Sequence, residues 1–243
     1  TNPLLDKLCK KVYRLKLLNK SDLADKSITA QWLDYYTSLG MADAVAICGT
    51  RREEALKVMD YCVTKIKRNR ARKVKVLVVG IPNTGKSTLI NTLAGKKIAK
   101  TGNVPAVTRH QQRTSLTRLI DIYDTPGILW PVIEPEQKAF RLAASGAIAD
   151  TAIDYSQIAF FTTRFLIKSY PELLVSRYPY LAPLSIDPMV VLETIGRKKG
   201  CLKKGGIVDI QKASEALIRE LRAGKIGQIS FETPKDLTND TEI

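Results

Sequence analysis

Residues 80–87 read Gly-Ile-Pro-Asn-Thr-Gly-Lys-Ser, and this stretch decides the fold. It satisfies the pattern G-x-x-x-x-G-K-[ST], in which backbone N–H groups of a glycine-rich loop and a helix N-terminus surround phosphate oxygens. The apolar residues 76–79 before it predict a strand and residues 86–93 after it predict a helix, which is the context that the motif needs. We expect Lys86 to reach the β and γ phosphates and Ser87 to offer its hydroxyl to magnesium. The nucleotide-contacting residues predicted for this loop are Pro82, Asn83, Thr84, Gly85, Lys86, Ser87 and Thr88.

A second motif, Asp124-Thr125-Pro126-Gly127, follows the mainly apolar, strand-like stretch 119–123. The pattern D-x-x-G is common by chance, so its weight comes from its place at the end of a predicted strand, 38 residues after Lys86. There it predicts that Asp124 binds the magnesium ion through a water and that Gly127 senses the γ-phosphate.

A third motif, Asn19-Lys20-Ser21-Asp22, ends the predicted strand 12–18. A carboxylate at Asp22 can accept hydrogen bonds from both N1–H and the exocyclic N2 amine of guanine, an arrangement that adenine lacks. Asn19 and the Lys20 stem would support the base, so the motif predicts selection of GTP over ATP. The simpler interpretation is a solvated turn that caps the next helix.

The order of the motifs is unusual, because Asn19 precedes Gly80 by 61 positions whereas an ordinary GTPase has its phosphate loop first. Two interpretations remain open at this point: a circularly permuted G domain, or an accidental N-K-S-D upstream of an ATPase. A Ras-like sheet has six strands and the pattern gives about five. In a permuted order the missing strand would directly precede Thr1.

Strand-like and helix-like stretches alternate through the first half of the chain. The predicted strands are 12–18, 44–48, 76–79 and one or two within 114–123, and the predicted helices are 29–39, 53–67 and 86–93. This alternation favours a doubly wound sheet with helices on both faces.

Helical spacing replaces this pattern after Pro135, at Leu142, Gly146 and Ala149 and again within residues 158–166. Asp187 before Pro188, and Asp209 before another amphipathic stretch, are good helix N-caps. We therefore predict an α/β domain over residues 1–131 and an all-α domain over residues 132–243.

The composition points to a polyanionic partner. The 243 residues hold 39 Lys and Arg against 24 Asp and Glu, a net charge of +15, and 44% are hydrophobic, which excludes disorder throughout. No apolar run is long enough to span a bilayer. The four cysteines are scattered without a C-x-x-C pair, so neither a disulfide framework nor a zinc site is indicated, and a reducing, intracellular compartment fits best.

Five cations within eight positions predict an RNA-binding loop, and the other interpretation is a solvated basic loop. They are Arg197, Lys198, Lys199, Lys203 and Lys204.

The three motifs, together with Ile128-Leu129-Trp130-Pro131, resemble the RbgA/YlqF family of circularly permuted GTPases that act in assembly of the large ribosomal subunit, including mitochondrial members. The resemblance runs from residue 2 to residue 234. It implies a circularly permuted Ras-like P-loop GTPase domain followed by a smaller all-α domain, with GTP or GDP and magnesium bound. It also implies the large subunit and its rRNA as partners, in the cytoplasm or the mitochondrial matrix. In that family a helix and a strand, with a proposed catalytic histidine, precede the point where this chain begins.

The resemblance assigns further roles and shows some departures. Thr108 would be the switch magnesium ligand, although the family's P-G-x-T reads Pro105-Ala106-Val107-Thr108 here. Cys48 and Gly49 would contact guanine through their backbone, and Asn83 would help to hold a potassium ion. The residues implied in catalysis are Lys86, Thr108, Gly127 and Asn83.

An aliphatic residue, Ile128, stands where Ras-like enzymes place a water-orienting glutamine, so we expect slow hydrolysis by the chain alone. The resemblance implies that the ribosomal subunit stimulates it. His110, the only histidine, lies two residues after Thr108, and a solvated role competes with a catalytic one. Two rival functions remain: a GTP-switched signalling or membrane-surface GTPase, and an RNA-binding scaffold with an inactive nucleotide site.

Overall fold

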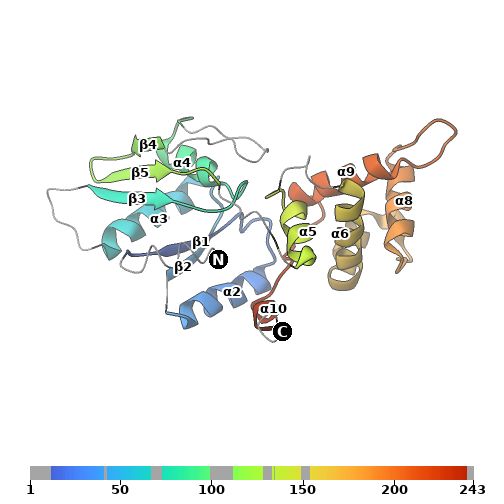
Figure 1. Ribbon diagram of the computed structural model, residues 1–243, viewed down its shortest axis with the longest axis horizontal. Coiled ribbons are helices and arrows are strands. Elements are labelled where there is room, and N and C mark those ends of the chain that lie inside the picture. The colour runs from blue at the N-terminus through green and yellow to red at the C-terminus, as the bar shows by residue number, and fades with distance from the viewer. Residues whose placement is uncertain are drawn as a thin grey trace.

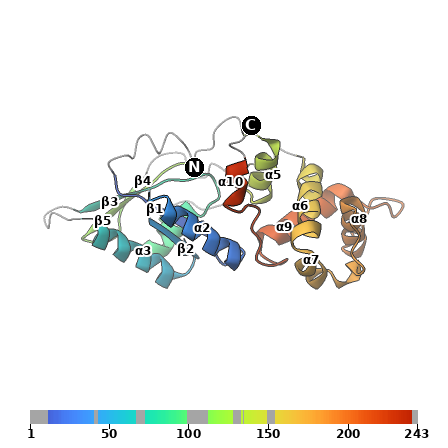
Figure 2. The ribbon, with the colours of Figure 1, turned by 90° about the horizontal axis from the view of Figure 1, so that it is seen from below.

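The computed structural model has an α/β part at the N-terminal side and a helical part at the C-terminal side, lying next to each other (Figures 1 and 2). It describes residues 12–40, 43–66, 73–98, 112–127, 133, 135–148 and 154–239. Within this range no helix is long and apolar enough to cross a membrane.

The five described strands form two sheets. β1 (Leu15–Asn19) pairs in parallel with β2 (Asp43–Ile47). β5 (Ile120–Asp124) lies between β3 (Val74–Val78), which runs parallel to it, and β4 (Gln112–Ser115), which runs antiparallel. The single doubly wound sheet that we predicted is therefore divided, because in the described chain β1 and β3 are not paired with each other.

Three helices accompany these strands: α2 (Lys26–Ser38), α3 (Arg52–Lys65) and α4 (Lys86–Ala94). α3 and α4 place apolar side chains in the core with the strands, as the alternating pattern predicts, whereas α2 has no buried residue. The buried core of this part comprises Ile47, Ala55, Val58, Met59, Cys62, Val74, Leu89, Ile90, Leu93, Ile120 and Ile122.

The helical part contains six α-helices and one 3₁₀ turn within the described residues. These are α5 (Glu136–Ala144), α6 (Tyr155–Ser169), α7 (Pro171–Arg177), η2 (Pro179–Leu181), α8 (Pro188–Lys198), α9 (Ile210–Arg222) and α10 (Lys235–Asn239). Both predicted N-caps are confirmed, because Asp187 accepts from the N–H of Met189 and Asp209 from that of Lys212. The single helical face predicted through Gly146 is wrong, because α5 ends at Ala144 and Gly146 adopts a φ of +80°.

A second hydrophobic core fills the helical part and shares no buried residue with the first. It comprises Ala143, Ala144, Ile158, Ala159, Leu166, Leu174, Tyr178, Leu181, Val191, Leu192, Ile195, Leu217, Ile218, Leu221 and Ile226. Each part therefore has the apolar interior that a separate folding unit requires.

Candidate nucleotide site

The phosphate loop lies between β3 and α4 (Figure 1). Its turn needs left-handed backbone at Asn83 (φ 56°) and Gly85 (φ 88°). Ile81 anchors the loop, since its carbonyl accepts from the Lys86 ammonium at 2.8 Å and from the Thr84 hydroxyl at 3.0 Å. Burial lowers the pKa of Lys86, and the nearby Asp124 carboxylate opposes that shift. The loop thus has the conformation of a phosphate loop, and Lys86 lies within it.

A hydroxyl and a carboxylate meet below this loop. The Ser87 hydroxyl donates to Oδ2 of Asp124 at 3.0 Å, and Asp124 is almost fully buried at the end of β5. The Thr125 hydroxyl ties the second motif to the end of β3 by donating to the Val78 carbonyl at 2.7 Å. Two hard oxygen groups that face one point fit a magnesium ion, directly or through water.

The second motif also touches the phosphate loop directly. A Cβ built on Gly127 would lie 2.7 Å from the Cα and 2.8 Å from the nitrogen of Pro82. Neither contact leaves room for a side chain, so only glycine permits this approach. Gly127 is thereby adjacent to the loop expected to hold the γ-phosphate.

Asn19 connects the third motif to the first. Its amide nitrogen donates to the carbonyl of Thr84 at 2.7 Å, and its oxygen accepts from the N–H of Gly49 at 2.8 Å. The contact with Thr84 spans 65 positions of sequence. The motif that comes first in the chain therefore lies at the phosphate loop, which favours the permuted G domain over an accidental N-K-S-D.

The loop after β2 differs from expectation in one respect. The backbone N–H of Cys48 donates to Glu54 at 2.6 Å and that of Gly49 donates to Asn19, so both groups that we expected to face guanine already have protein partners. Glu54 was not among the predicted site residues; it lies in the first turn of α3, six positions after Cys48. A backbone contact with guanine would replace one of these bonds. The carboxylate-bearing residue Asp22, in contrast, is exposed.

Four of the five predicted RNA-binding cations are exposed and have no acidic partner among the described residues: Arg197, Lys198, Lys203 and Lys204. The loop that carries the last two is closed by a bridge between Leu202 and Val208.

Lys199 differs from those four cations. Its ammonium pairs with Glu220 and lies 5.6 Å from the centre of the Tyr178 ring. Burial would raise the pKa of Glu220, but hydrogen bonds from Arg177, Lys199 and Tyr178 outweigh it and lower the pKa to about 2. This cluster stabilises the helical part, and the charge of Lys199 is neutralised within it.

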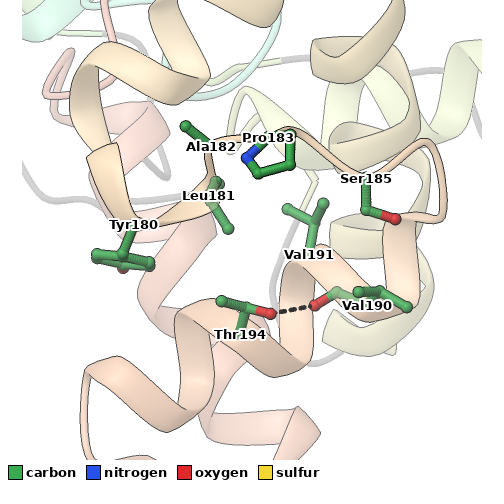
Figure 3. A pocket seen from close by; sticks show the side chains of 8 residues that line it. All are labelled: Tyr180, Leu181, Ala182, Pro183, Ser185, Val190, Val191 and Thr194. Carbon is green, nitrogen blue, oxygen red and sulfur yellow. Dashed lines mark hydrogen bonds between the residues drawn. The ribbon is translucent and has the colours of Figure 1, made fainter.

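Three residues named in the sequence analysis, Thr108, His110 and Ile128, lie outside the described residues. A pocket of about 110 Å³ is present in the helical part, between η2 and α8 (Figure 3). Its polar lining side chains are Ser185, Thr194 and the Tyr180 phenol, and none is charged. It therefore has no cation comparable to Lys86 of the phosphate loop.

Comparison with known proteins agrees with this geometry. The model of the family described as 50S ribosome-binding GTPase matches residues 75–168. Ribosome biogenesis GTPase A of Bacillus cereus is 40% identical over 99% of this chain and 84% of its own length, and that of Thermotoga maritima is 35% identical over 91% and 77%. The GDP-bound structure of TM YlqF, 32% identical, aligns with a TM-score of 0.65 over 91% of this chain and 84% of that one. With its N-K-x-D motif placed before the phosphate loop, the chain is a circularly permuted GTPase and belongs to the ribosome biogenesis GTPase A (RbgA/YlqF) family.

Proposed function

We propose that this protein hydrolyses GTP during assembly of the large ribosomal subunit and binds rRNA through its helical part. The observation that carries the proposal is the meeting of three motifs: Asn19 bonds to Thr84, Ser87 faces Asp124, and Gly127 packs on Pro82. Bacterial relatives named for ribosome biogenesis support the setting and favour the cytoplasm. A mitochondrial protein of Arabidopsis thaliana, 33% identical over 60% of this chain, supports the matrix if the source is eukaryotic.

Each group in the site has a defined part in phosphoryl transfer. Lys86 would neutralise charge on the β and γ phosphates, and the N–H of Gly127 would bind a γ-phosphate oxygen. Ser87 and Asp124, with Thr108, would hold magnesium, which neutralises charge on the phosphates when bound.

Asn83 belongs to the phosphate loop but is held by the helical part. Its amide nitrogen donates to the carbonyl of Gly146 at 2.7 Å. The amide oxygen is the atom that would contribute to a potassium site, since alkali cations take oxygen ligands. Hydrolysis that rises with potassium in the wild type, and much less in Asn83→Ala, would support this assignment.

Turnover should be slow without the ribosome. Ile128 supplies no group to orient water, and an added positioning group contributes ~10³ to 10⁵-fold in GTPases generally. The decisive assay measures GTP turnover with and without large subunits. Stimulation is expected, and Lys86→Ala should abolish nucleotide binding or turnover. Fast basal hydrolysis of about 1 per second that ignores subunits and potassium would refute the activation model.

Guanine selection is assigned to Asp22. Asp22 is exposed in the loop after β1, which Asn19 ties to the phosphate loop, and this supports a role in reading the base. Calorimetry should give GDP an affinity up to ~10⁴-fold above that of ADP. Asp22→Asn should shift preference toward xanthine nucleotides, and equal affinities for GDP and ADP in the wild type would contradict the assignment.

RNA binding is assigned to the basic loop and the end of α8. Each neutralised phosphate releases counterions, so log affinity falls linearly with log salt at ~0.9 per contact for a duplex. Replacing Arg197, Lys198, Lys203 and Lys204 with Ala should flatten that slope. A charge-matched control removes exposed lysines of the α/β part: Lys26, Lys57, Lys96 and Lys97. Equal slopes for the two variants would place the RNA surface elsewhere.

A membrane-surface GTPase remains the second candidate because of one observation. Leu202 and Ile207 are exposed on the same loop as Lys203 and Lys204. The two apolar residues lie on a short loop that the Leu202–Val208 bridge closes, whereas membrane-surface helices present a continuous apolar face. Sedimentation with anionic vesicles, absent for the four-alanine variant, would favour this candidate over rRNA.

The proposed division is a G domain over residues 1–131 and an rRNA-binding domain over residues 132–243. The two separate hydrophobic cores support it, because their residues fall on either side of that boundary. Limited proteolysis should cut between the two cores and leave both products folded.

A further inference from the structure

The segment that follows α9, residues 224–232, runs along the loop that carries Asp22; we call this segment the strap. Three successive strap residues satisfy backbone groups of that loop. The amide of Gln228 donates to the carbonyl of Asp22 at 3.1 Å, and the N–H of Ile229 donates to the carbonyl of Leu23 at 2.9 Å. The Ser230 hydroxyl accepts from the N–H of Asp25 at 3.2 Å. The strap therefore binds the main chain of the loop that carries Asp22.

Close packing accompanies these hydrogen bonds. Gly224, the left-handed residue after α9 (φ 69°), lies so near Leu23 that a Cβ would be 2.6 Å from its Cδ2. At the other end of the strap, the Trp32 indole N–H donates to the carbonyl of Glu232 at 3.0 Å. Contacts at both ends show that the strap follows the loop into α2.

Tyr170 adds a third connection from the helical part. Its hydroxyl lies 3.2 Å from Oδ2 of Asp25 and accepts from the N–H of Ser230 at 3.2 Å. Asp25 is also the N-cap of α2, so one residue joins the loop, the helix and the strap.

We infer that the strap positions Asp22 for guanine, so that the helical part forms a portion of the base-recognition site. Asp22 itself is exposed and its loop includes a residue with left-handed backbone, Lys20 (φ 60°). A carboxylate that must meet two donors of guanine at once needs its backbone held, because small displacements lose aligned hydrogen bonds. Gln228 and Ile229 donate hydrogen bonds to the carbonyls of Asp22 and Leu23, respectively. The inference rests on the proposed role of Asp22.

The sharpest test compares GDP with IDP, which has N1–H but lacks the exocyclic amine. Calorimetry on the full chain should give the wild type about tenfold or more preference for GDP, the worth of one hydrogen bond to a charged group. Gln228→Ala and Gly224→Ala should lower this ratio severalfold. A purely structural defect would reduce both affinities together and leave the ratio unchanged.

Matched controls separate positioning from backbone strain. Gly40 also follows a helix with left-handed backbone (φ 61°), but nothing lies within 4 Å of a Cβ there, so Gly40→Ala should keep the ratio. Gln157, exposed on α6, is the control for Gln228. Adding Leu23→Ala to Gly224→Ala removes the collision and should restore the preference. If Gly224→Ala fails to fold, the ratio of GDP to IDP affinity in Gln228→Ala still tests the inference.

The outcomes separate this inference from the proposed function. Suppose that the ratio of GDP to IDP affinity is unchanged in Gln228→Ala while Asp22→Asn loses guanine preference. That result refutes the positioning role of the strap and leaves the proposed role of Asp22 intact. An unchanged preference in Asp22→Asn refutes both, because the strap would then have no base-reading group to position.

Discussion

Replacing Gly127 with alanine should separate the two loops that surround the γ-phosphate. The added Cβ would lie 2.7 Å from the Cα of Pro82, where carbon atoms normally approach to about 3.5–4.0 Å. The backbone of Gly127 is outside the left-handed region, so alanine introduces a collision without backbone strain. The phosphate loop is held by hydrogen bonds at Ile81 and Thr84. Gly127 should therefore be the group that moves, by about 1 Å.

The cost of this displacement should appear in hydrolysis. A misplacement of ~1 Å at a reacting group costs on the order of 10²-fold in rate, which is about 2.7 kcal/mol. Single-turnover GTP hydrolysis at saturating nucleotide and magnesium measures it. GDP lacks the γ-phosphate, so its affinity should stay within about threefold of the wild type.

Two results would refute this argument. An unchanged single-turnover rate would mean that Gly127 is not at the γ-phosphate, and an equal loss of GDP affinity and of rate would mean that the whole phosphate loop had moved. Gly40→Ala provides the control for a glycine replacement in open space.

Two further predictions concern the metal and the helical part. Ser87→Ala should raise the magnesium concentration needed for half-maximal hydrolysis, because its hydroxyl faces Asp124 at 3.0 Å; a magnesium titration of turnover measures this. Glu220→Gln should lower the melting temperature by roughly 3–6 °C, since Arg177 and Lys199 lose their partner. The pKa of Glu220 falls from 4.5 to about 2 on folding, so its stabilisation is present above pH 4.5 and is lost as the pH falls toward 2. A wild type whose stability is constant between pH 5 and 2, or equals that of Glu220→Gln, would contradict the second prediction.

Local chemistry made much of the fold predictable. A strand before Gly80, and helices after Asp187 and Asp209, follow from apolar runs and capping side chains that need no tertiary information. The short helix after Tyr170 was missed, although Pro171 at its first position was a usable signal. Residues that act only because the fold brings distant segments together could not be identified from sequence spacing.

The candidate site was predictable as a set of motifs but not as a geometry. The contact from Asn19 to Thr84 could be expected only from the resemblance, because 65 residues separate the two. Gln228 binds a main-chain group 206 positions away, and such a contact carries no sequence pattern. Glu54 is local by comparison, because it lies in the first turn of α3, six positions after Cys48. In the sequence Lys199 is indistinguishable from the other cations of the basic stretch, and only the fold shows that it pairs with Glu220.

The indole of Trp32 gives the strap an optical signal of its own. It stacks on Tyr36 with ring centres 5.7 Å apart while its N–H is bound to the carbonyl of Glu232. Release of that carbonyl would expose the indole to water and shift its fluorescence emission to longer wavelength. The chain has only two tryptophans, so replacing Trp130 with phenylalanine leaves Trp32 as the single tryptophan, which can be excited selectively at wavelengths that tyrosine does not absorb. The protein thus contains a label-free reporter, sited where its two parts join, that can be followed while nucleotide and RNA are added.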